Sequence, residues 1–96
     1  MKRFKVKYSA NALTDIENAT FYYNQQKAGL GKRFAQEVRK KLRKVKTHPY
    51  SSSIRYADIR CAIVNIFPFL IHYQIDEENN IINIISVYNT YRDALS

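Results

Sequence analysis

Two histidines, His48 and His72, are the side chains of this chain best suited to proton transfer near neutral pH. Metal-free cleavage of RNA, for example, needs a base for the 2′-hydroxyl, an acid for the leaving oxygen and cations around the phosphorane. His72 falls in an apolar run, where a partly buried strand histidine is the commoner outcome. His48 precedes Pro49, and a cation at a helix end suits the helix dipole. The sequence therefore predicts no catalytic set.

Metal and cofactor sites are equally weakly supported by the pattern. Asp76, Glu77 and Glu78 stand together, but Asn79 and Asn80 follow directly, and this composition is typical of a solvated turn. No Cys and His pair has the spacing of a metal site, and two glycines are too few for a phosphate-binding loop. We therefore predict neither a metal nor a cofactor.

The excess of positive charge is concentrated in one stretch of the chain. Residues 28–60 hold ten Lys and Arg against two Asp and Glu (10 − 2 = +8), whereas the remainder holds six of each (6 − 6 = 0). Such a patch attracts nucleic acid, an acidic protein or an anionic surface, although a solvated basic face also keeps a small protein in solution. The side chains predicted to form this face are Lys32, Arg39, Lys40, Arg43 and Lys44.

Exposed tyrosines beside cations could stack on nucleic-acid bases. The chain offers several such residues, although tyrosines are also ordinary strand and interface residues. They are Tyr22, Tyr50, Tyr56, Tyr88 and Tyr91.

Two helices joined by a short turn are needed to position these groups. Ser9 is a predicted N-cap for a helix over residues 10–26, which ends where Ala28 and Gly29 break the pattern. A second helix begins near Leu30 and ends at His48, because the residue before a proline is pushed out of helical geometry. The apolar face of the first helix is predicted as Leu13, Ile16, Thr20 and Tyr23, with Ala12 and Ala19 beside them. That of the second is Leu30, Phe34, Val38, Leu42 and Val45.

Strand patterns occupy the rest of the chain. Residues 4–8 alternate apolar and charged side chains, and three further strands are predicted over residues 59–67, 69–75 and 81–88. A turn is predicted at Phe67-Pro68-Phe69 and another over residues 76–80. The order predicts an α+β fold: an N-terminal strand and an α-helical hairpin packed on one face of an antiparallel sheet. We expect one domain over residues 1–96.

The chain shows no pattern typical of export or of membrane insertion. No apolar run approaches membrane-spanning length, and the basic first residues are not followed by the apolar stretch of a signal peptide. Cys61 is the single cysteine and cannot form an intrachain disulfide. We therefore expect a cytoplasmic protein that does not bind membranes.

This order of elements, together with several motifs, resembles the ParE/RelE toxin superfamily over nearly the whole chain. The helical motifs are Ala12-Leu13-Thr14-Asp15-Ile16 and Gly31-Lys32-Arg33-Phe34. The sheet motifs are Ile59-Arg60, Phe67 to Tyr73, and Val87 to Asp93. The resemblance implies the toxin of a type II toxin–antitoxin system, a non-catalytic inhibitor of DNA gyrase that is silenced by a cognate antitoxin. It also allows a homodimer, or a hetero-oligomer with the antitoxin.

The matched sheet motifs also contain the residues predicted to bind a target or partner, which are Arg60, Tyr73, Tyr88 and Arg92. Arginines present planar, always-charged groups to acidic or phosphate surfaces, although Arg92 and Asp93 could equally form a weak surface ion pair.

Departures from the superfamily pattern keep two alternatives open. RelE-like mRNA endonucleases, which act on the ribosome, usually carry an arginine where this chain has Leu70, and a Tyr or His near the C-terminus, where this chain ends Ala94-Leu95-Ser96. Asn89 stands where members often have a histidine, and Ala94 where they often have a proline. The alternatives are a RelE-like endoribonuclease and a toxin-derived binding module that has lost its toxicity.

Overall fold

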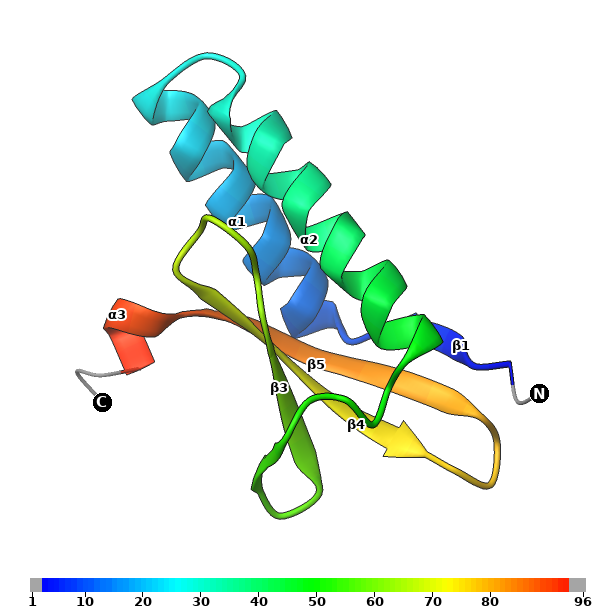
Figure 1. Cartoon of the computed structure of the whole chain (residues 1–96). Coiled ribbons are helices and arrows are strands. Elements are labelled where there is room, and N and C mark those ends of the chain that lie inside the picture. Colours follow the sequence, from blue (N-terminus) through cyan, green and yellow to red (C-terminus); the bar gives the residue numbers. More distant parts are fainter. Residues whose placement is uncertain (1–2, 94–96) are drawn as a thin grey trace.

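Two long helices lie across one face of a five-stranded sheet (Figure 1). The computed structural model of the chain describes residues 3–93, and of residues 92 and 93 it describes the backbone alone. The elements follow in the order β1 (Lys5–Tyr8), α1 (Ala10–Gln26), α2 (Leu30–Thr47), β2 (Ile54–Tyr56), β3 (Ile59–Ile63), β4 (Phe69–Asp76), β5 (Ile81–Asn89) and α3 (Thr90–Asp93). The predicted α+β class and the helical hairpin on one face of the sheet are confirmed.

The sheet has the strand order β1-β5-β4-β3-β2, so the first strand pairs with the last. β1 runs parallel to β5, whereas the other three pairings are antiparallel. The predicted strand over 59–67 ends earlier, at Ile63, because the chain turns between Val64 and Phe69, where Ile66 has a positive φ of 75°. The sequence also missed the short edge strand β2 and the short helix α3.

The helix boundaries match the predicted ones because their signals are local. Ser9 caps α1: its Oγ accepts a hydrogen bond from the Ala12 amide at 3.0 Å and donates one to the Ile85 carbonyl at 2.6 Å. At the turn, Gly29 has a φ of 87°, which few other residues adopt. Gly31 then lies so close to α1 that its amide donates to the Asn24 side chain at 2.8 Å.

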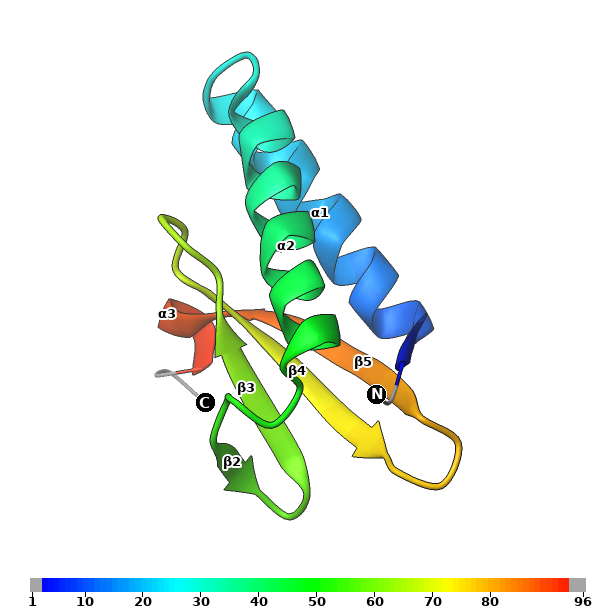
Figure 2. The ribbon, with the colours of Figure 1, turned by 45° about the vertical axis from the view of Figure 1, so that its right-hand side comes forward.

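The two long helices lie side by side over the sheet (Figure 2). One hydrophobic cluster joins them to it. The predicted stripe of α2 is buried from Phe34 to Val45, and Leu30 packs at its edge. In α1 the prediction for Leu13 was wrong, because this side chain is 49% exposed. The face that meets the sheet is centred instead on the small residues Ala12 and Ala19, with Ile16 and Tyr23, so the helix can approach closely.

Candidate functional site

The outer face of α2 is a continuous cationic surface. All five predicted residues, Lys32, Arg39, Lys40, Arg43 and Lys44, are exposed. The helix carries eight Lys and Arg and one acid, Glu37. Within residues 3–91, whose side chains the structure describes, the only salt bridge joins Glu37 to Lys40 at 3.5 Å. The other cations of this face therefore keep their charge available to a partner.

Arg60 and Tyr73 are cross-strand partners in β3 and β4, and both hold the segment between α2 and β2. The Arg60 guanidinium donates to the carbonyls of Ser52 at 2.5 Å and Tyr50 at 3.3 Å, and lies 5.3 Å from the centre of the Tyr50 ring. The Tyr73 side chain is fully buried, and its hydroxyl donates to the Pro49 carbonyl at 2.6 Å. Both side chains therefore fix a loop, and Tyr73 has no surface to offer a target.

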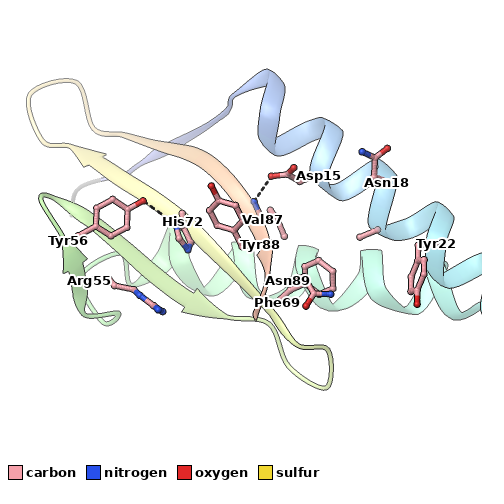
Figure 3. Close-up of a pocket in the computed structure, with 11 residues that line it drawn as sticks. Asp15, Asn18, Tyr22, Arg55, Tyr56, Phe69, His72, Val87, Tyr88 and Asn89 are labelled. Atoms are coloured by element: carbon pink, nitrogen blue, oxygen red, sulfur yellow. Dashed lines mark hydrogen bonds between the residues drawn. The ribbon is translucent and has the colours of Figure 1, made fainter. Parts of the chain in front are cut away.

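The predicted residue Tyr88 lines a groove that extends from the sheet face opposite the core, around the end of β5, to α1 (Figure 3). Side chains alternate between the faces of a strand, so His72 of β4 points away from the core that Ile71 and Tyr73 enter. The His72 ring meets the Tyr88 ring edge to face at 4.7 Å and contacts the Tyr56 ring at 6.1 Å. The groove has a volume of about 830 Å³.

α1 forms the second wall of this groove. β1 pairs with β5 only as far as Ile84, so the last residues of β5 form a free edge beside the helix. There the Asp15 carboxylate accepts a hydrogen bond from the Val87 amide at 3.0 Å, while Asn18 and Tyr22 line the wall (Figure 3). The sequence did not single out Asp15 for this site. An acidic side chain near the start of a helix is already explained by its favourable interaction with the helix dipole.

The groove combines aromatic rings with few charges. Tyr22, Tyr56 and Tyr88 are between 43% and 58% exposed, so their rings can contact a ligand or a protein side chain. Arg55 is the one Lys or Arg among the described lining residues and was not predicted as a site residue. His72 is only 2% exposed, and its Nδ1 lies 3.4 Å from the Tyr56 hydroxyl. The arrangement suits stacking and hydrogen bonding better than proton transfer to a substrate.

Two of the positions that depart from the superfamily pattern have structural contacts here, and one of them, Asn89, also lines the groove. Leu70 is 7% exposed and pairs with Tyr88 in the sheet. The Asn89 side chain accepts a hydrogen bond from the Tyr91 amide at 2.9 Å and so caps α3. Arg92 belongs to α3, directly after β5, but its side chain lies outside the described residues, as do Ala94 and the two residues after it.

The acidic turn after β4 is held together by its own hydrogen bonds. The Asn79 side chain and amide both donate to Asp76, at 2.9 and 3.2 Å. These bonds hold the pKa of Asp76 below its ordinary value. No group of three or more His, Cys, Asp or Glu among the described residues could hold a metal ion. Likewise, no helix within residues 3–93 is long and apolar enough to cross a membrane.

Comparison with known proteins gives a consistent picture. The family described as "ParE toxin of type II toxin-antitoxin system, parDE" matches residues 6–94. Compared with curated protein sequences, the chain has no match.

Among solved structures, a chain of the chromosomal ParDE toxin–antitoxin system from P. aeruginosa is similar with a TM-score of 0.80 and 11% identity, over 93% of this chain and 98% of that one. A mutant of the E. coli toxin RelE in the free state has a TM-score of 0.68 and 20% identity, over 99% and 96%. A chain of the intact E. coli RelBE toxin–antitoxin complex has a TM-score of 0.63 and 19% identity, over 88% and 93%.

Proposed function

Because the chain belongs to the ParE toxin family of type II toxin–antitoxin systems, we propose that it is a non-catalytic inhibitor of DNA gyrase in the cytoplasm. The observation that carries this proposal is the composition of the groove on the sheet. Its described lining is rich in aromatic side chains and holds two asparagines, one aspartate and a single arginine. Stabilising the transition state of phosphodiester cleavage needs several cations close to the reacting phosphate. A groove of this composition is better suited to binding a protein surface.

An antitoxin partner is the second part of the proposal. The similar structures include chains from ParDE and RelBE toxin–antitoxin systems. The surface of this chain carries large exposed apolar side chains, among them Leu13 and Phe21 on α1 and Ile54 and Ile63 at the β2–β3 edge, each between 49% and 68% exposed. Apolar surface of this kind on a small domain is covered by a partner in many proteins. A bound antitoxin would cover it and restrain the toxin, as a hetero-oligomer, while a homodimer is the alternative assembly.

Two assays on the purified toxin test the proposed target. In the first, gyrase supercoils relaxed plasmid with increasing toxin, with and without the cognate antitoxin. In the second, the toxin is added to translating ribosomes and the mRNA is mapped for cuts. We expect inhibition of supercoiling that the antitoxin relieves, and intact mRNA. Uninhibited supercoiling at a large excess of toxin would contradict the proposal.

Two matched variants test whether the groove takes part. Tyr88 in the groove and Tyr8 on β1 are both 43% exposed, so Tyr88→Ala and Tyr8→Ala remove the same side chain from equally accessible positions. We expect Tyr88→Ala to weaken gyrase inhibition at least about fivefold and Tyr8→Ala to leave it within about threefold, because truncating an interface aromatic often costs over ~1 kcal/mol. Equal inhibition by both variants would place the contact elsewhere.

The two predicted arginines need different tests. Arg92→Ala is expected to reduce toxicity while the protein stays folded and bound to antitoxin. Arg60→Ala removes two hydrogen bonds to the loop after α2, so its stability must be measured beside its toxicity. If both variants are as toxic as the parent, these arginines do not carry the function.

A RelE-like endoribonuclease is the second candidate, and one observation favours it. His72 lies between two tyrosines in the groove, with Arg55 among the lining residues. A proton-transfer role would require Tyr56 or Tyr88 to move, since the imidazole is 2% exposed. Discrete cuts in translated mRNA that disappear in His72→Gln would establish this candidate. Inactivity in both assays would favour a binding module without toxicity.

A further inference from the structure

The net positive charge of the protein arises almost entirely from one helix. α2 carries eight cations and one acid (8 − 1 = +7), out of a net charge of +8 for the chain. The apolar stripe of the helix faces the core, so the cations cover its outer side. An 18-residue helix is about 27 Å long, which corresponds to roughly eight base pairs of duplex DNA at about 3.4 Å per pair.

The outer side of α2 contains no apolar anchor. Of the large hydrophobic side chains that are exposed among the described residues, none belongs to α2; they lie on α1, α3, the strands β1, β2, β3 and β5, and the loops. Protein interfaces depend on a buried aromatic or aliphatic core and are depleted in lysine. Interfaces with nucleic acid are instead polar and strongly positive. The composition of this face therefore fits nucleic acid better than an acidic protein.

The same face also lacks the exposed aromatic side chains that bind single-stranded nucleic acid. Single-stranded nucleic acid binds where aromatic side chains stack on its bases beside the cations. The exposed tyrosines nearest in sequence lie outside the helix, on α1 and in the loop that follows α2. What remains is a straight row of flexible, exposed cations, which can neutralise phosphates without reading bases.

We propose that the outer face of α2 binds the phosphate backbone of duplex DNA without regard to sequence. Arg39, Arg43 and Lys46 follow one another at spacings of four and three residues, so they form one row of exposed cations. Near the end of the helix, a shallow hollow of about 530 Å³ lies between Lys40, Lys44 and the loop residues Ser51 and Ser52. A phosphate seated there would lie close to the two lysine side chains. The inference does not depend on which target the toxin inhibits.

The test measures binding of the full chain to a fluorescent 24-base-pair duplex by anisotropy between 50 and 200 mM KCl. Each neutralised phosphate contributes about −0.9 to the slope of log K against log salt concentration. The triple variant Arg39→Gln/Arg43→Gln/Lys46→Gln is therefore expected to lower the magnitude of the slope by about 2.7, and to weaken binding at 100 mM at least tenfold. Glutamine is a good helix former, so α2 should persist, and circular dichroism verifies this.

A matched variant separates the helix face from overall charge. Lys5→Gln/Lys7→Gln/Lys27→Gln removes three exposed cations elsewhere, so the net charge falls equally. We expect it to retain the slope of the parent, as Arg39→Lys/Arg43→Lys also should. Equal losses in both triple variants would overturn the proposal, and so would a lack of duplex binding. Tighter α2-dependent binding to single-stranded RNA, or an effect of the α2 variant on antitoxin binding alone, would overturn it as well.

Discussion

Tyr73→Phe removes one oxygen atom from the core and tests the structural role given to this residue. The hydroxyl lies in a fully buried site and donates to the Pro49 carbonyl at 2.6 Å. Removing a donor and leaving a buried acceptor unsatisfied costs about 1–3 kcal/mol. In a domain of this size, each kcal/mol lowers Tm by about 4–8 °C. We therefore expect the variant to melt at least about 4 °C below the parent.

The matched control is Tyr88→Phe, the same change at a 43% exposed position of the neighbouring strand. Its effect should stay within about 0.5 kcal/mol, as for most surface substitutions. Urea unfolding of both variants, monitored by circular dichroism, gives the two free energies. Equal stability of the two variants would refute the idea that the Tyr73 hydroxyl stabilises the fold through its hydrogen bond to Pro49. If Tyr73→Phe protein is folded and as stable as the parent but less toxic, the result would support the original prediction that Tyr73 takes part in binding.

Arg60 provides an internal check, because it holds the same loop from the adjacent strand. If the two side chains hold the same segment, the losses of unfolding free energy in Tyr73→Phe and Arg60→Met should not be additive. A double-mutant cycle is expected to show a coupling of about 0.5 kcal/mol or more. Strict additivity would mean that the loop is held by other contacts.

Four further substitutions test the packing and the acidic turn. Leu42→Ala should destabilise the protein by about 2–5 kcal/mol in urea unfolding, because the side chain is 7% exposed in the core. Gly31→Ala should cost more stability than Gly29→Ala, although the positive φ of Gly29 strains any other residue. A Cβ at Gly31 would collide with the backbone oxygen of Thr20 and with the Asn24 side chain, whereas one at Gly29 meets nothing within 4 Å; the reverse order would contradict the helix contact. The hydrogen bonds that lower the pKa of Asp76 stabilise the fold when the carboxyl group is ionised. Their contribution to the free energy of unfolding is complete at pH values above the ordinary pKa of 3.8, and it is lost as the pH falls through the lower pKa of the folded state. Acid titration of Asp76→Asn should therefore show a shallower loss of stability than the parent, and parallel curves would argue against the role of the turn.

The helices could be predicted from the sequence because their signals are local. Ser9, the Gly29 turn and Pro49 mark the ends, and the spacing from Phe34 to Val45 identifies the buried stripe of α2. The cationic outer face follows from the same periodicity, since residues opposite a buried stripe face water. The family resemblance rested on motifs in their order along the chain, which is also information that a sequence holds.

Strand pairing decided the rest, because it joins residues that are distant in sequence. No local pattern says that β1 lies parallel to β5, or that β1 ends early enough to leave an edge for Asp15. Arg60 and Tyr73 look like surface and site residues in the sequence, but the register places them side by side over one loop. The groove around His72 likewise exists only because residues of β4 and β5, together with β2 and α1, come together in space.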